Sequence, residues 1–269
     1  MGYAPVGRCI YCGSQDNRLG REHIIPLALS GDLVLPAASC RACEKVTGGF
    51  EQRVLQGPLL SARAALELRT RRPDRRPTTF PIRVCTGAVE VEVEVNAPLD
   101  AYPQAVILPM YDPPRYFQHD DAREGVSVSG FYLGHVGTVP AEVLERCYPG
   151  ADGISVEGMY PVVEFARMIA KIGYSYAVAE LGLDHVVDPL VLPAIRGLTN
   201  DIGMWVGTIG DDAFAAPADT LHRCGLLTEH GVIALVQLFA LQPSPLYAVA
   251  ISEHPPSMKT GASRGPQPV

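Results

Sequence analysis

The sequence predicts an α+β protein in two unequal parts. Residues 1–56 form a small cysteine-rich module, and residues 78–252 form a larger, mixed and mainly antiparallel α+β domain. Two Cys-x-x-Cys pairs and little regular periodicity mark the first part, whereas strand-like alternation and one long helical segment mark the second. Between them, residues 57–77 read as a helix followed by an Arg/Pro-rich linker.

The boundary between the two parts is predicted at the end of a short helix. The segment PLLSARAALEL within Gly57–Leu68 is rich in Ala, Leu and Glu, which favour helix. It runs into RTRRPDRRP, where two prolines and several arginines end the helix.

The second part begins with a predicted hairpin over Thr79–Cys85 and Val89–Val95. The latter segment, VEVEVEV, alternates strictly and therefore has one apolar and one solvated face. Further strands are expected at Ala105–Met110, Val126–Leu133, Gly203–Ile209, Gly231–Leu241 and Leu246–Ile251.

One strong helix is predicted among these strands, over Pro161–Leu181. Its apolar residues recur at three- and four-residue spacing, proline lies in the first turn, and Gly182 follows the end. The tail, residues 253–269, is poor in apolar residues and is expected to be disordered.

Composition and charge limit the classes of function. The chain is 47% hydrophobic and 19% charged, and it has neither a signal-peptide pattern nor an apolar run long enough to cross a bilayer. We therefore expect a cytoplasmic protein with no membrane partner. Residues 1–76 hold 12 Lys and Arg against 7 Asp and Glu, whereas the remainder holds 10 against 22. This asymmetry points to a nucleic-acid face on the cysteine-rich part.

The four paired cysteines predict a structural zinc site. Cys9 and Cys12 are separated from Cys40 and Cys43 by 27 residues, a pattern typical of tetrahedral Zn²⁺ held by four thiolates. A module of this size buries too little surface to fold reliably alone, and a structural zinc contributes about 10–16 kcal/mol. The alternative is that the pairs form disulfides or simply pack.

Between the two pairs lies REHIIP, in which Glu22 precedes His23. A histidine with a pKa near 6.5 can take a proton from water at neutral pH. The adjacent carboxylate can hold a hard cation, which prefers oxygen ligands. In isolation such a pair is more often an exposed polar pair than a catalytic one.

Three segments of the module, CIYCG, REHIIPLALSGD and CRACEKVTGGFE, cover residues 9–51 and together resemble the HNH endonuclease family in its zinc-stapled, four-cysteine form. The resemblance implies a ββα-metal fold, in which two antiparallel strands and a helix surround a metal. It implies that His23 is the general base that activates water. It also implies that Glu22 is a ligand of a catalytic Mg²⁺ or Mn²⁺ that binds the scissile phosphate.

The sequence departs from the family pattern at two positions. Glu44 follows the second cysteine pair where the family usually has asparagine, so we expect Glu44 to act as a metal ligand and catalytic-site residue in its place. The middle asparagine of the motif has no clear match, and Asp32 is the nearest substitute. Glu51, on the same face of the expected helix as Glu44, is a further candidate ligand of the divalent metal. The alternative for Glu51 is a solvated helix face.

Arginines are the predicted contacts to the nucleic-acid backbone. They are Arg8, Arg18, Arg21, Arg41 and Arg53 in the module and Arg69, Arg71, Arg72, Arg75 and Arg76 in the linker. Nonspecific binding arises when such side chains replace counterions along the phosphates. The alternative for the linker cluster is a solvated, Arg-rich segment.

These observations give three hypotheses for function. The first is metal-dependent hydrolysis of phosphodiester bonds in DNA, with RNA left open as a substrate. The second is a catalytically inactive, zinc-stapled adaptor that binds nucleic acid or protein, because the asparagine position is altered. The third is a metabolic enzyme in residues 78–251, which a polar ligand pocket far from His23 would support.

Overall fold

The computed structural model describes the chain apart from residues 1, 16–17, 87–90, 119–123, 138, 157, 211–218, 257–266 and 269, and apart from the side chains of 91–93 and 267–268. Within the described residues the chain is an α+β protein, as predicted, and every strand pair is antiparallel. The predicted start of the second hairpin strand and most of the predicted disordered tail lie outside the described residues.

The cysteine-rich part contains two strands and a helix in sequence order. β1 (Gly20–His23) pairs with β2 (Val34–Ser39), and α1 (Arg41–Gln56) follows directly. α1 ends at Gly57, whose backbone angles are non-helical. α2 (Leu60–Ala65) is shorter than the predicted helix, because the chain restarts only after Gly57 and Pro58 and turns left-handed at Glu67.

The remaining elements are the predicted strands and long helix, together with several short elements that the sequence did not predict. The strands are β3 (Thr79–Thr86), β4 (Val91–Pro98), β5 (Ala105–Tyr111), β6 (Val128–His135), β7 (Gly153–Ser155), β8 (Val206–Ile209), β9 (His222–Leu227), β10 (Val232–Leu238), β11 (Leu246–Ser252) and β12 (Gln267–Pro268). The other α-helices are α3 (Pro140–Cys147), α4 (Val162–Leu181) and α5 (Leu192–Ile195). Short 3-10 helices cover Leu27–Leu29, Pro73–Arg75, Leu99–Ala101, Arg115–Gln118, Leu183–His185 and Ile202–Met204.

Most predicted strands are confirmed to within a few residues, and two differences have local causes. The strand predicted from Gly203 begins only at Val206, because Ile202–Met204 form a 3-10 turn. β9 was not predicted, since its sequence HRCGLL lacks alternation and contains a glycine.

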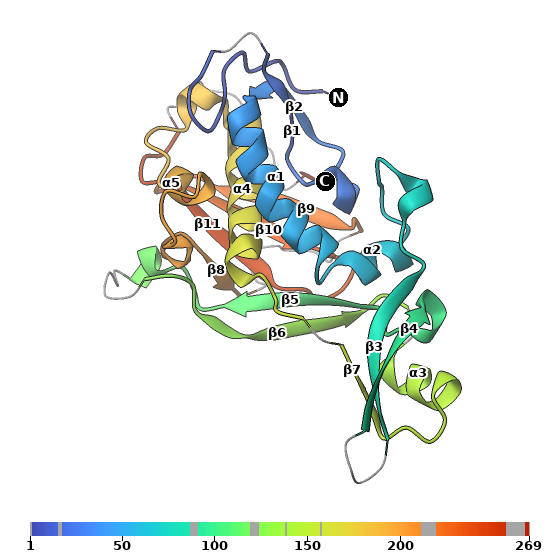
Figure 1. Ribbon diagram of the computed structural model, residues 1–269. Coiled ribbons are helices and arrows are strands. Elements are labelled where there is room, and N and C mark those ends of the chain that lie inside the picture. Colours follow the sequence, from blue (N-terminus) through green and yellow to red (C-terminus); the bar gives the residue numbers. More distant parts are fainter. Residues whose placement is uncertain are drawn as a thin grey trace.

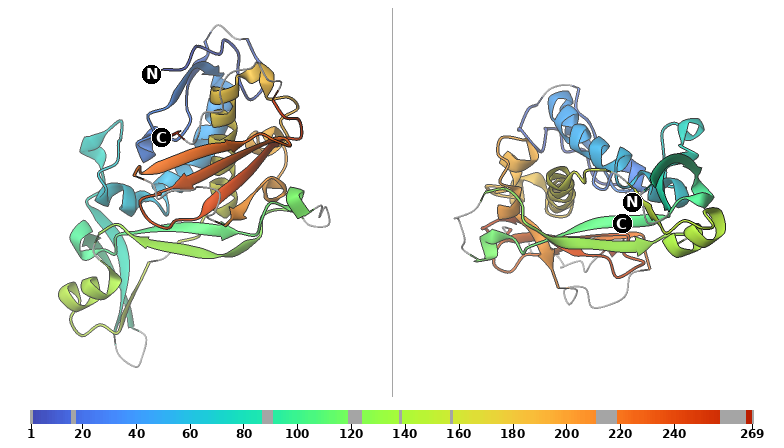
Figure 2. Two further views of the ribbon diagram at one scale, coloured as in Figure 1. Left: turned by 180° about the vertical axis from the view of Figure 1, so that it is seen from behind. Right: turned by 60° about the horizontal axis from the view of Figure 1, so that its bottom comes forward.

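The predicted long helix is confirmed as α4, which ends at Gly182 with φ 90°. It lies between α1 on one side and the five-stranded sheet on the other (Figures 1 and 2). Its residues from Phe165 to Val178 are buried almost without interruption, so the helix is buried on all faces along this stretch rather than on one. α4 is therefore the central element of the main body.

The five-stranded sheet has the order β12-β9-β10-β11-β8. Its inner face packs on α4, where Ala234 and Val249 lie 3.0 Å from the position that a Cβ on Gly173 would occupy. A larger residue at Gly173 would push the helix off the sheet. This close approach fixes the rotation of α4 and hence the direction in which its other side chains point.

β3, β4, β7 and α3 form an arm that projects from the main body (Figure 1). The arm and α2 share a separate apolar cluster that includes Ala64, Phe80 and Ile82. By contrast, one continuous cluster joins the cysteine-rich part to α4 and the five-stranded sheet. The packing therefore runs across the predicted linker, and the two-domain division stays a prediction.

The longest described helix, α4, carries four charged side chains. Among the residues that the structure describes, no helix combines the length and apolarity needed to cross a membrane.

Candidate functional site

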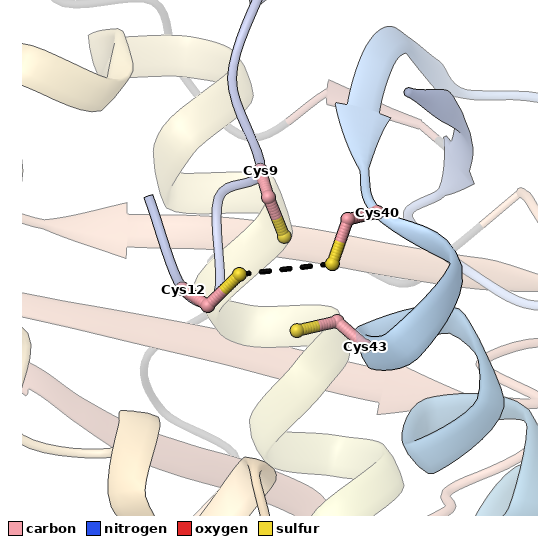
Figure 3. A group of neighbouring side chains, drawn as sticks. All are labelled: Cys9, Cys12, Cys40 and Cys43. Atoms are coloured by element: carbon pink, nitrogen blue, oxygen red, sulfur yellow. Dashed lines mark hydrogen bonds between the residues drawn. The ribbon is translucent and has the colours of Figure 1, made fainter. Parts of the chain in front are cut away.

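The four paired cysteines converge at the amino-terminal end of α1. Cys9 and Cys12 come from the loop before β1, whereas Cys40 and Cys43 come from the N-cap and first turn of α1 (Figure 3). All four sulfur atoms lie within 4.8 Å of one another, and Sγ of Cys12 lies 3.6 Å from Sγ of Cys40. Two sulfur ligands of a tetrahedral zinc lie about 3.8 Å apart.

The chemistry of these thiols fits a metal centre. None of the four is in a disulfide, so the disulfide alternative does not apply. Burial alone would raise the pKa of Cys40, but the backbone N–H of Cys43 and the neighbouring thiols outweigh it and lower that pKa to about 7. Burial raises the pKa of Cys9 and of Cys43, so in the absence of a metal ion these two thiols stay protonated. In the part of the chain that is described, this is the only group of three or more His, Cys, Asp or Glu side chains whose ligand atoms converge. The group can hold a metal ion such as zinc.

His23 ends β1, and the residues after it anchor the loop. Ile24 and Ile25 are fully buried, and the N–H of Ile24 donates to the carbonyl of Leu33 over 3.0 Å. The imidazole of His23 is half-buried, and its Nδ1 has no hydrogen-bond partner. Burial and the ammonium of Lys171 lower the pKa of His23, although Glu22 opposes them. At neutral pH the imidazole is therefore unprotonated and can accept a proton.

A groove of about 390 Å³ is lined by the predicted catalytic residues Glu22, His23 and Glu44. His23 lies on its wall together with Glu44 and Glu51 of α1, which share a helix face as predicted. The cationic side chains that line it are Arg21, Arg63, Arg69, Arg71 and Lys171. The volume lies in the range of ligand sites in proteins, about 300–1,000 Å³.

Glu22 and Glu51 share a cation that the sequence did not suggest. Nζ of Lys171, on α4, lies 2.6 Å from Oε1 of Glu22 and 3.0 Å from Oε1 of Glu51. The same ammonium donates to the carbonyls of His23 and Ile24. The side chain of Lys171 is 1% exposed and that of Glu22 is 7% exposed. These two carboxylates are thus held by an ammonium from the other part of the chain.

In this buried cluster the charges of Lys171, Glu22 and Glu51 shift the pKa values of Lys171 and Glu51. Burial opposes the charged form of Lys171, but Glu22 and Glu51 outweigh it and raise the lysine pKa. Burial also raises the pKa of Glu51, although Lys171 acts in the opposite direction. The fully buried phenol of Tyr11 lies near both carboxylates, and burial and their charges raise its pKa. One ammonium therefore serves two carboxylates in a region of low dielectric.

The predicted arginines divide into two sets. Arg21, Arg69 and Arg71 line the groove, whereas Arg41, Arg72 and Arg75 are exposed outside its lining. Arg76 donates from Nη2 to the carbonyl of Leu68 over 2.7 Å and so has a structural contact. The arginines of the linker thus do not act as one patch.

Asp32, the candidate substitute for the motif's asparagine, forms an exposed ion pair with Arg69. Its side chain is 65% exposed, and it does not line the groove. The position therefore gives no support for a role of Asp32 in orienting the loop that bears His23.

Two groove residues were missed by sequence reasoning. Lys171 had one available signal, since it is a cation placed directly between Ile169-Ala170 and Ile172 in a long, mainly apolar helix. No sequence signal indicated Arg63, because it belongs to a short Ala-rich helix. Its guanidinium donates to the carbonyls of Ala28, over 2.8 Å, and Leu55, over 2.5 Å, at the edge of the groove.

A second, smaller cavity lies in the other part of the chain. It has a volume of about 130 Å³ and is lined by polar residues including Asp112, Arg115 and Glu124. This is below the usual size of a ligand site. It gives the third hypothesis, a metabolic enzyme in the second part, little support.

Comparison of the chain with protein-family models, with curated proteins and with solved structures gave no match.

Proposed function

We propose that the chain is an HNH-type nuclease: the groove binds the backbone of a nucleic acid, DNA in the first instance, and His23 activates the water that attacks a phosphodiester. The single observation that carries this proposal is the position of His23. Its neutral imidazole lines a groove that is also lined by arginines, and because Nδ1 is buried without a partner, Nε2 is the ring nitrogen left to face the groove. A general base needs an accessible, unprotonated nitrogen close to the bound substrate.

The reaction balances with His23 as the base. The oxygen of water bonds to phosphorus, and the proton that it releases passes to the imidazole. The bond from phosphorus to the leaving oxygen breaks, and that oxygen takes a proton from solvent. Arg21 and Arg71 supply positive charge next to the phosphate as negative charge builds up on its oxygens. The four-cysteine group, holding zinc, keeps β1 and α1 together and takes no part in the chemistry.

The predicted divalent ion fits the residues less well than the predicted zinc. Glu22 and Glu51 are engaged by Lys171, and the described carboxylates do not converge as a ligand set. Glu44 is exposed at the groove and remains a candidate ligand. No step above passes through a divalent ion, so Mg²⁺ and Mn²⁺ enter as conditions of the assay.

Nicking of supercoiled plasmid by the purified, zinc-loaded chain tests the proposal. Wild type and His23→Ala are compared without added divalent ion, with Mg²⁺ and with Mn²⁺, and zinc content is measured for both. We expect nicking by the wild type and none by His23→Ala at equal zinc content. His230→Ala changes an exposed histidine outside the groove and should cut like the wild type. Nicking that survives His23→Ala would remove His23 from the mechanism.

One observation favours the second candidate, an inactive adaptor that binds nucleic acid. Two of the three carboxylates expected to hold a catalytic metal are bound to Lys171 instead. The Glu44→Asn variant, which restores the residue usual in the family, separates the two candidates. If the wild type binds DNA without cutting it and Glu44→Asn cuts, the adaptor is correct.

A further inference from the structure

We infer that Lys171 is the resident cation of this site: its ammonium occupies the place between Glu22 and Glu51 that a divalent metal would otherwise take. The inference rests on the proposed function for its consequence in catalysis, but not for the arrangement of the residues. Lys171 then acts as a positioning residue that holds the acidic pair and the loop of His23.

The surroundings of the ammonium are those of a bound cation. Four oxygen atoms lie around Nζ: carboxylate oxygens of Glu22 at 2.6 Å and Glu51 at 3.0 Å, the carbonyl of His23 in close contact, and the carbonyl of Ile24 at 3.3 Å. Carboxylates and carbonyls are also the ligands that Mg²⁺ and Mn²⁺ select. The same oxygens cannot serve both cations, because a divalent ion on them would lie only a few ångströms from the ammonium and be repelled.

The lysine cannot easily move aside. It lies at the middle of α4, the most deeply buried helix of the protein, between the fully buried Ala170 and Ile172. The hydroxyl of Ser175 donates to the backbone carbonyl of Lys171 over 2.6 Å, one turn later in the helix. The cation is therefore built into the fold rather than recruited from solution.

The arrangement also links the two parts of the chain. Lys171 reaches from the helix that packs on the five-stranded sheet to the backbone of His23 in the cysteine-rich part. The second part of the chain thus supplies a charge to the site, and the cysteine-rich part is incomplete without it. In catalysis the groove arginines would provide the positive charge that a metal provides elsewhere, and the zinc-loaded chain would cleave without added Mg²⁺ or Mn²⁺.

Direct binding of Mn²⁺ to the zinc-loaded, full-length chain tests the inference independently of cleavage. Isothermal titration calorimetry and Mn²⁺ electron paramagnetic resonance are applied to wild type, Lys171→Ala and the double variant Lys171→Ala/Glu51→Gln. We expect no site at Glu22 and Glu51 in the wild type. Lys171→Ala should gain one Mn²⁺ site, with affinity at least about tenfold above the wild type, because repulsion by the ammonium is removed. The double variant should lose that site.

Each other result overturns the inference. A wild-type Mn²⁺ site that disappears in Glu51→Gln would show that a metal displaces the ammonium. A folded Lys171→Ala chain that gains no site would show that the carboxylates do not form a cation site. If Lys171→Ala does not fold by itself, millimolar Mn²⁺ should restore its fold, and failure to do so also counts against the inference. Absence of DNA cleavage would refute the proposed nuclease but would leave these binding results unchanged.

Discussion

Nζ of Lys171 lies 2.6 Å from Oε1 of Glu22, which joins the central helix α4 to the first strand of the cysteine-rich part. Both side chains are almost fully buried, so this contact lies in a region of low dielectric. It places the acid of the REHIIP segment in an ion pair and fixes the backbone on which His23 is carried. The stability of the site and its chemistry are therefore expected to depend on the same residue.

Lys171→Ala should lower the free energy of unfolding by about 3–5 kcal/mol, since it leaves two carboxylates in the interior without their cation. Urea unfolding of the zinc-loaded protein measures this change. Lys45→Ala, at an exposed position on α1, should change it by no more than about 0.5 kcal/mol. Equal effects of the two substitutions would contradict a structural role for the buried ion pair.

Loss of one thiol should weaken binding of the metal. Purified wild type is expected to contain one zinc per chain, and Cys43→Ser should contain much less, because the three thiolates that remain bind the ion more weakly and a chelator removes it more readily. Zinc content is measured by elemental analysis, and loss of structure on adding a chelator by circular dichroism. Cys147→Ser lies outside the group and should retain one zinc. A wild-type chain that folds fully and stays folded without zinc would refute the structural role.

Gly48 and Gly49 form a matched pair in the middle of α1. A Cβ at either position meets no atom within 4 Å, so Gly→Ala at each should stabilise the protein by about 0.5–1 kcal/mol.

Of these two glycines, only Gly48 lines the groove. Gly48→Leu should therefore weaken binding of duplex DNA, whereas Gly49→Leu should not, as measured by fluorescence anisotropy. Equal binding by the two leucine variants would place the nucleic acid elsewhere.

The groove arginines should set the salt dependence of DNA binding. Arg21→Ala and Arg71→Ala should each reduce the slope of log K against log salt by about 1, because each removes one phosphate contact. Arg196→Ala, at an exposed position outside the groove, should leave the slope unchanged. The slopes are obtained from anisotropy titrations at several salt concentrations, and a reduced slope in Arg196→Ala would contradict the assignment.

His222 predicts a loss of stability in acid. Its Nε2–H donates to the carbonyl of Leu29 over 2.8 Å, its Nδ1 accepts from the N–H of Phe239 over 3.1 Å, and burial lowers its pKa to about 4. Between pH 6.5 and 4 the unfolded chain binds a proton at this histidine that the folded chain does not bind. The contribution of His222 to the free energy of unfolding should therefore be complete above pH 6.5. It should fall by roughly 3 kcal/mol as the pH drops towards 4.

The His222→Gln variant keeps a donor and an acceptor but does not titrate. Its stability should fall less steeply than that of the wild type over this interval, as followed by urea unfolding at several pH values. His230→Gln changes an exposed histidine and should retain the wild-type pH dependence. Parallel curves for wild type and His222→Gln would show that His222 does not cause the acid dependence.

Local pattern predicted the elements of this fold far better than it predicted the site. α4 and the β3–β4 hairpin could be predicted from the spacing and alternation of apolar residues, because each position's burial is visible in its own residue type. The convergence of four thiols follows from ligand chemistry and could likewise be predicted. The partner of Glu22 could not, because Lys171 reaches it only through the packing of α4 against α1 and the sheet. The same packing decides which arginines face the groove and which face solvent.

The central claim, that His23 in this groove takes a proton from water to cut a phosphodiester, is tested most directly by measuring binding and cleavage of one duplex DNA in parallel. Wild type and His23→Ala, matched for zinc content, are mixed with the same labelled duplex at neutral pH, with and without divalent cations. The account predicts that both bind with similar affinity and that only the wild type cuts. Cleavage by His23→Ala at the wild-type rate, or binding by both without cleavage under any condition, would contradict it.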